Sequence, residues 1–324
     1  MTYSSGGLIQ ATDYNTFATN TNAFWSTGTG NAGWGQTSVA SVSTSGVVTA
    51  TNWATLVNNL AAGSNHTGQA ITTRTAPVTG NIVAILANVA TDITSLTASS
   101  GNAAGTGTQY TGWTGTASKT SATGSGSTPW TITFTNTVTW ASADAARYFF
   151  NAGGRIKWET SKTADTTAAD TEWNDLANTL VGDIYITKGN GTQTIAAVPY
   201  TGTTKTGGTG TPTTLLTTTG WFGLTTGDTT IYKQFADTSP YTGQYIQINA
   251  KTAGSGTQLV LTTTWVDPGG SGTGSSDVIS GGSDTTSPFS SFGTAPCTLV
   301  TVIPPSSTYL SNTWGTPTIA ATVA

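Results

Sequence analysis

The sequence contains very few of the side chains that enzymes use for catalysis. Its 324 residues include one cysteine, one histidine, 10 Lys and Arg, and 14 Asp and Glu. Most active sites need several positioned groups of these types with tuned pKa values. This scarcity predicts a protein that is not an enzyme, with no cofactor and no metal ion.

Other shortages exclude further classes of protein. The single cysteine, Cys297, cannot form an internal disulfide, and its apolar neighbours favour a small buried side chain in a strand. The net charge is −4 and the basic residues are scattered, so no basic stripe is available to bind nucleic acid. No apolar run approaches the roughly 20 residues that cross a bilayer, and residues 1–7 lack the features of a signal peptide. We expect a soluble protein without membrane insertion, made in a cytoplasm.

The residues that are abundant indicate a folded, strand-rich chain. Threonine is the commonest residue, and the sequence also holds 40 glycines. β-Branched threonine favours strands, which glycine-containing turns would join. The 11 Trp, 10 Tyr and 9 Phe supply enough large apolar groups for a core, which argues against disorder.

Three helices are predicted in the first hundred residues. Large apolar side chains recur at helical spacing over Ala11–Trp25, Asn52–Ala62 and Asn81–Leu96. Thr51 is the expected N-cap of the second helix and Gly63 its expected C-cap. We interpret residues 1–97 as a small helical module for attachment or oligomerisation.

The rest of the chain predicts a linker followed by a β-rich domain. Residues 98–128 are rich in Gly, Ser and Thr, which is typical of a linker or an exposed arm. Residues 129–324 show the period-two alternation of strands, with helices near 142–150 and 171–181. The predicted fold class is therefore mainly β (α+β): a small helical module followed by an antiparallel, sandwich-like β domain with one or two packed helices.

Several strands can be placed from the pattern alone. Period-two alternation begins at Trp130, and a further strand covers Cys297–Ile303 before two prolines end it. The strongest hairpin pairs Tyr241–Lys251 with Gln258–Val266 across a glycine-rich turn. Ser142 is the expected N-cap of the helix that follows the first of these strands.

The few ionisable side chains have structural explanations. His66 lies in a segment that favours a capping or surface role, since no cysteine or carboxylate cluster accompanies it. The acidic residues of one segment precede or begin a predicted helix, where carboxylates offset the helix dipole; they are Asp165, Asp170, Glu172 and Asp175. A glycosidase that uses Glu159 or Glu172 is a third, enzymatic alternative, although no motif fixes such a pair.

Aromatic rings in Gly- and Thr-rich surroundings are the remaining binding signal. Such rings can stack on sugars, and they also serve as core residues. The candidates for glycan contact are Trp221, Phe222 and Trp265. They motivate an alternative function, a module that binds a host-surface glycan.

Three segments of the chain carry a resemblance to a known family. The first covers residues 13–68, with DYN at 13–15, FWSTGTGNAGWGQ at 24–36, VTA at 48–50 and the Trp53/Leu56/Leu60 helix that ends in HTG at 66–68. The others are AARYFFNAGGRI at 145–156 and PPSSTYLSNTWGTP at 304–317. Together they resemble a type of tailed-bacteriophage virion protein, frequent among cyanophages, that is described as a structural or tail-fibre protein. The resemblance implies assembly into a particle and no enzymatic activity.

The expected function follows from composition and resemblance together. We expect a component of a phage tail, neck or baseplate that forms a cyclic homo-oligomer and contacts other virion proteins. It would be made in the host cytoplasm and located in the virion. Large apolar side chains of the helices and of the glycine-rich segment after the first one are the candidates for the partner interface: Trp25, Trp34, Trp53, Leu56, Leu60, Tyr148, Phe149 and Phe150.

Overall fold

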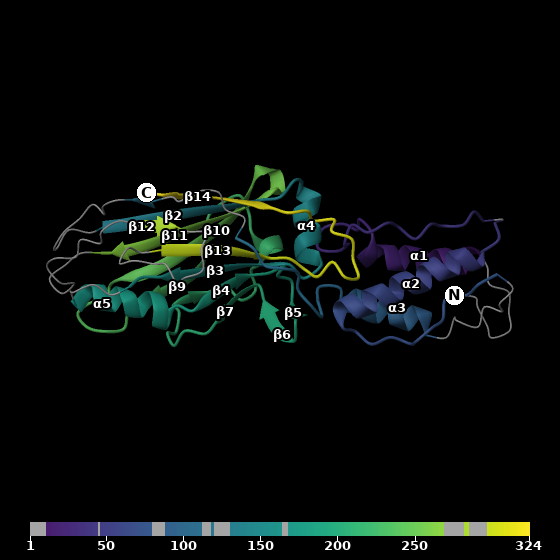
Figure 1. The fold of residues 1–324 in the computed structure, drawn as a ribbon, viewed down its shortest axis with the longest axis horizontal. Coiled ribbons are helices and arrows are strands. Elements are labelled where there is room, and N and C mark those ends of the chain that lie inside the picture. Colours follow the sequence, from purple (N-terminus) through teal and green to yellow (C-terminus); the bar gives the residue numbers. More distant parts are fainter. Residues whose placement is uncertain are drawn as a thin grey trace.

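Three helices form one end of an elongated molecule, and β-sheets form the rest (Figure 1). The helices are α1 (Ala11–Trp25), α2 (Ala50–Thr67) and α3 (Val89–Ala98). Each contacts the other two. The computed structural model describes residues 11–44, 46–79, 88–111, 118–119, 130–163, 168–268, 282–284 and 297–324.

Helix α1 confirms the spacing argument. Its predicted bounds, Ala11–Trp25, are the observed ones, and its buried side chains include Tyr14, Phe17, Thr21 and Phe24. These positions are three or four residues apart, so they form one stripe that packs against the other helices.

Helix α2 differs from the prediction at both ends. Its N-cap is Thr49, which forms a capping box with Asn52, and not Thr51. The helix continues through Gly63 and ends at Gly68, which has φ 74° and donates its N–H to the Ser64 carbonyl. Gly63 is an interior residue because its small surface faces the rings of Phe24 and Trp34.

Helix α3 begins later than expected. The prediction covered Asn81–Leu96, and the structure places the helix at Val89–Ala98. Residues 80–87 lie outside the described residues. Val89 and Ile93, two members of the predicted stripe, are buried in the core that the helices share.

The described strands form two six-stranded sheets and a separate hairpin. The order in the first sheet is β1 (Ser118–Lys119), β12 (Gly282–Asp284), β13 (Cys297–Ile303), β3 (Arg155–Ser161), β4 (Asp183–Ile186), β7 (Thr203–Thr206). The order in the second is β14 (Thr318–Val323), β2 (Trp130–Thr139), β11 (Gln258–Asp267), β10 (Tyr245–Ala253), β9 (Thr229–Phe235), β8 (Thr214–Leu215). The hairpin pairs β5 (Thr192–Ile195) with β6 (Val198–Thr201).

Antiparallel pairing dominates both sheets and confirms the predicted fold class. The predicted hairpin is present as β10 and β11, and Cys297–Ile303 is a strand that buries its cysteine. Among the described strands, the short β12–β13 pair is parallel. Alternate residues of β11 are buried, which is the period expected of a sheet with one face on the core.

Two helices accompany the sheets, close to their predicted positions. Helix α4 (Ala143–Asn151) has Ser142 as its N-cap, whose side chain accepts the N–H of Ala145. Helix α5 (Ala168–Asp175) continues as a π-helical turn, Leu176–Leu180. Core side chains of both sheets, of these helices and of α1–α3 belong to one hydrophobic cluster.

The described part of the predicted linker is fixed to the strands. Ala103 bridges to Ile195, Thr106 to Pro305 and Tyr110 to Val302. Residues 112–117 and 120–129 lie outside the described residues. The segment 101–111 therefore runs along the β-rich part, and backbone bridges hold it to the strands and to the segment that follows β13.

Candidate functional site

Trp34 lies at the centre of the junction between the three helices and the β-rich part. Its indole N–H donates to the carbonyl oxygens of Ser100 at 2.9 Å and Asn151 at 3.2 Å. Its ring packs edge-on against Phe24 and His66, with centroids 5.2 and 5.1 Å apart. A single buried side chain thus connects α1, α2, the segment after α3 and the end of α4.

The loop that carries Trp34 needs glycine on both sides of it. Gly33 has φ 91° and Gly35 has φ 72°, conformations that other residues rarely adopt. A Cβ atom on Gly33 would lie 2.4 Å from the Thr27 carbonyl oxygen, and one on Gly35 would lie 2.5 Å from the Tyr148 ring. The glycines let the loop turn tightly enough to place the indole in the core.

Helix α4 holds the same loop from the β-rich side. The Arg147 guanidinium donates to the carbonyl oxygens of Thr27 and Gly30, each at 3.0 Å, and pairs with Asp144. The Asn151 amide donates to the Gly33 carbonyl oxygen at 3.1 Å. Carbonyls that the tight loop leaves unpaired are satisfied in this way by one face of α4.

A segment close to the C-terminus completes the junction. The Gln36 amide donates to the Ser311 carbonyl oxygen at 3.0 Å and accepts the Ser311 N–H at 2.8 Å. The Thr313 hydroxyl donates to the Trp34 carbonyl oxygen at 2.7 Å. The segments 24–36, 145–156 and 304–317, which are far apart in the sequence, therefore meet at one place.

His66 is a core residue of the junction, whereas the sequence favoured a capping or surface role. It lies in the last turn of α2 and is 2% exposed. Its Nε2 is 3.0 Å from the Ala152 carbonyl oxygen, a distance at which a neutral imidazole donates. Burial lowers the pKa of His66 to about 4, against the smaller opposite effect of this hydrogen bond.

The predicted partner-interface residues are placed in the core. All are buried: Trp25, Trp34, Trp53, Leu56, Leu60, Tyr148, Phe149 and Phe150. Trp53 packs against Tyr14 and Phe17 within the helices, and Phe149 and Phe150 pack against Trp140. The structure thus corrects the surface role given to these side chains, and a partner surface has to be built from other residues.

The predicted glycan-contact residues are also occupied by the protein itself. Trp221 stacks on Phe150 with centroids 5.0 Å apart, and Trp265 stacks on Trp173 at 5.4 Å. Phe222 is half-buried against the same core. Two of the three rings therefore have no free face for a sugar in this fold.

The acidic residues near α5 form a small cluster that the sequence showed only in part. Carboxylate oxygens of Glu172, Asp175 and Asp237 lie within 4.8 Å of one another. Glu172 also accepts the N–H of Thr238. Carboxylate oxygens at this spacing have the chemistry to bind a hard divalent cation. Asp165 lies outside the described residues, and nothing is described of the Asp170 side chain.

Glu159 has a separate environment. Its carboxylate forms an ion pair with the Lys157 ammonium, at 2.7 Å, and both residues lie on β3. Burial raises the pKa of the Glu159 carboxyl, and the neighbouring lysine has the opposite, smaller effect. Its ion pair is thus with a neighbour on β3, whereas Glu172 belongs to the cluster beside α5. Of the two glutamates named for the enzymatic alternative, Glu172 lies beside other carboxylates, and Glu159 is paired with a lysine.

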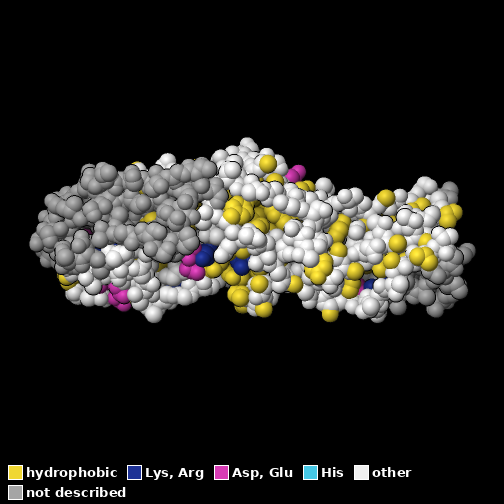
Figure 2. Space-filling model, in the orientation of Figure 1, with side chains coloured by type: hydrophobic (Ala, Val, Ile, Leu, Met, Phe, Trp, Pro, Cys, Tyr) yellow, Lys and Arg dark blue, Asp and Glu magenta, His cyan; other side chains and the backbone are white. Residues whose placement is uncertain are grey.

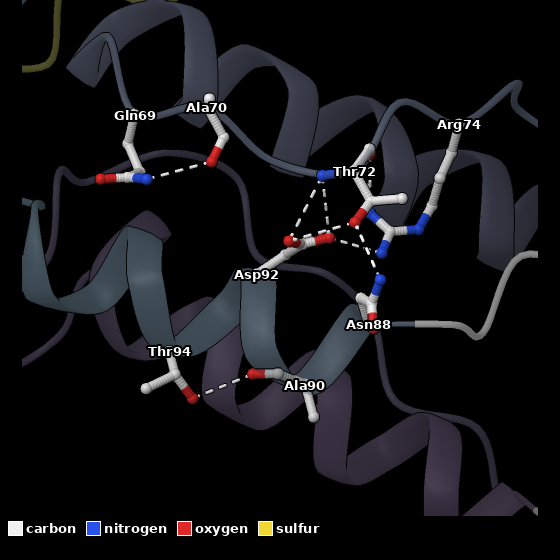
Figure 3. Close-up of polar contacts among 8 residues, drawn as sticks. All are labelled: Gln69, Ala70, Thr72, Arg74, Asn88, Ala90, Asp92 and Thr94. Atoms are coloured by element: carbon white, nitrogen blue, oxygen red, sulfur yellow. Dashed lines mark hydrogen bonds and ion pairs between the residues drawn. The ribbon is translucent and has the colours of Figure 1, made fainter.

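Arg74 and Asp92 form a buried ion pair that no sequence pattern indicated (Figure 3). Asp92 lies on α3, and Arg74 lies on the segment after α2. The Asp92 carboxylate also accepts the backbone N–H of Thr72, whose hydroxyl accepts from the Asn88 amide. A cavity of about 220 Å³ adjoins this group, lined by α2 residues such as Val57 and by Arg74.

A larger cavity of about 300 Å³ lies beside the junction. Its walls come from α1, the loop after it, the end of α3 and the segment 188–193. The polar side chains on it are Asn31, Thr97, Ser100, Asn102, Lys188, Asn190, Thr192 and Gln193. Burial lowers the pKa of Lys188 to about 8. This cavity is the candidate binding site of the described structure.

No protein-family model, curated protein or solved structure matches this chain. Among the helices that the structure describes, none has both the length and the apolar character needed to cross a bilayer. The arguments that follow therefore come from the residues and their geometry.

Proposed function

We propose that the protein is a structural component of a phage virion, in a tail, neck or baseplate appendage, and that it assembles there as a homo-oligomer. The junction around Trp34 is the observation that carries the proposal. It fastens the helices to the β-rich part through buried rings and hydrogen bonds from three distant segments. In an elongated body joined in this way, the helical end and the β-rich end keep a fixed position relative to each other (Figure 1).

The use of charge in the fold supports a structural role. Several ionisable side chains of the described residues form ion pairs, as in Arg74–Asp92, Arg147–Asp144, Lys157–Glu159 and Lys251–Asp228. Figure 2 shows a face on which charged side chains are few and uncharged ones predominate. Contacts between such surfaces rest on packing and neutral hydrogen bonds, which salt screens little.

The test is location and copy number in the particle. Immunogold electron microscopy with an antibody to this chain should label the tail or neck of purified virions at a constant number of positions. Light scattering of the purified chain should give a mass that is a whole multiple of 32.9 kDa above one. Absence of the chain from virions, or a monomer at all concentrations, would contradict the corresponding part of the proposal.

A junction variant adds a functional readout. Arg147→Met removes the donors to the Thr27 and Gly30 carbonyls, and we expect reduced incorporation into particles. Lys251→Met is the matched control because it removes a half-exposed ion pair of the β-rich part. Equal loss of incorporation in both variants would count against a special role of the junction.

The second candidate function is a module that binds a host-surface glycan. The cavity beside the junction favours it, because amide and hydroxyl side chains predominate among its polar lining groups. Trp221 and Trp265 are unavailable for stacking, so the cavity is the better site for this function.

A further inference from the structure

Lys188 is the unusual member of the cavity beside the junction. It is 8% exposed, yet no ion pair or hydrogen bond of its ammonium is seen among the described residues. The side chain is mostly buried, while its Nζ still reaches solvent through the cavity. An ammonium group that is largely withdrawn from water without a partner is less well stabilised than one on the open surface. No Asp or Glu is among the described residues that line this cavity. The positive charge therefore lacks a counter-charge from the wall of its own site.

The backbone around Lys188 is held in place. Its N–H donates to the Gln193 amide oxygen at 3.1 Å, and its carbonyl oxygen accepts the N–H of Phe222. The Gln193 amide nitrogen donates in turn to the Gly101 carbonyl oxygen at 2.7 Å. This network joins the segment 188–193 to the segment after α3, so the two walls of the cavity are fixed relative to each other.

Neutral hydrogen-bonding groups surround the lysine. Asn31, Asn190 and Thr192 are exposed at the rim of the cavity, and their side chains form no hydrogen bond within the described structure. The Asn102 amide nitrogen is also free to bond to a ligand. Asn190 also has φ 57°, a left-handed conformation that fixes the start of its side chain at the mouth of the cavity. The site thus offers one cation together with several amides and a hydroxyl.

We propose that this cavity binds a sugar acid, with the ligand carboxylate paired to Lys188 and the ligand hydroxyls bonded to the surrounding amides. A carboxylate supplies the counter-charge that the wall lacks, in a charge-assisted hydrogen bond. Hydroxyl groups match Asn and Thr side chains, which both donate and accept. A volume of about 300 Å³ suits a ligand of one or two sugar rings. The proposal specifies the ligand of the second candidate function and rests on it.

Binding is tested on the full-length chain with glucuronate and galacturonate as probes, followed by amide chemical shifts. We expect saturable binding of at least one of them, with shifts clustered at Gly101, Lys188 and Gln193. Glucose, which has the hydroxyls without the carboxylate, should bind about tenfold or more weakly. Inorganic phosphate tests for a simple anion site, and binding as tight as that of the sugar acids would overturn the assignment.

Two variants and a control identify the groups. Lys188→Met should weaken sugar-acid binding by about tenfold or more. Asn190→Gly, which keeps the left-handed conformation, should weaken it about threefold. Lys251→Met, a lysine of equal charge outside the cavity, should bind as the unaltered chain does. The glycine variant and the shift map decide the matter if Lys188→Met does not fold.

Two further results would overturn the proposal. One is unchanged sugar-acid affinity in Lys188→Met, and the other is the absence of binding of both probes to the unaltered, folded chain. Either result would leave virion location intact, since immunogold labelling measures that independently of any ligand.

Discussion

The buried imidazole of His66 should make the junction sensitive to acid. Its pKa is lowered to about 4, from the ordinary value of 6.5, chiefly because it is removed from water between α2 and the end of α4. In the unfolded chain the imidazole takes up a proton as the pH falls below 6.5, whereas in the folded chain it stays neutral down to about 4. The free energy of unfolding therefore decreases as the pH falls through this window.

The size of the effect follows from the pKa difference. One pKa unit corresponds to about 1.4 kcal/mol, so the shift of His66 costs about 3 kcal/mol of stability once the pH is below 4. His66→Gln removes the titration and keeps a side chain that can donate to the Ala152 carbonyl oxygen. Between pH 6.5 and pH 4 the unaltered chain should lose about 3 kcal/mol more stability than this variant.

The measurement is direct because the chain has one histidine. A nuclear magnetic resonance titration of the imidazole follows a single residue, and denaturant unfolding of both proteins at several pH values gives the stability difference. A His66 pKa near 6.5 in the folded protein, or the same pH dependence in both chains, would refute the reasoning.

Three further perturbations test other contacts. Trp34→Phe leaves the Ser100 and Asn151 carbonyls without their indole donor and should cost about 2 kcal/mol in denaturant unfolding; a loss near zero would mean that the junction tolerates the gap. Thr49→Ala removes the cap of α2 and should cost about 1 kcal/mol, whereas Thr51→Ala, at the exposed position that the sequence favoured as cap, should change stability little. Arg74→Met leaves Asp92 buried without its partner and should cost about 3 kcal/mol by the same assay, and Asp92→Leu in that background should recover part of the loss; additive losses would contradict the pairing.

The secondary structure was largely predictable because local patterns determine it here. Helix α1, the β10–β11 hairpin and the strand Cys297–Ile303 follow from the spacing of apolar side chains. The C-terminal end of α2 was not predictable. By sequence alone Gly63 is a typical helix end, and only the structure shows that the helix continues through it and packs there against Phe24 and Trp34. Tertiary contacts thus override a local signal at that glycine.

The candidate site was not predictable, for a different reason. Lys188 is an isolated basic residue in the sequence, and its cavity is formed with Asn31 and Asn102, which lie far from it in the chain. The aromatic residues drew attention because large rings can bind partners, yet their burial depends on the junction that packs them. Only three-dimensional contact separates the two kinds of residue.

The Gln36–Ser311 pair also sets a condition on how the protein is made. These residues are 275 positions apart, so the loop around Trp34 leaves the ribosome long before the segment that closes over it has been translated. During that interval the nascent helices expose the surface around the Trp34 loop that the C-terminal segment later covers. Partly folded chains with such exposed surface are prone to misassembly. The junction should therefore close late, after the C-terminal segment has been synthesised. Rapid production without chaperones should then favour aggregates over folded chains.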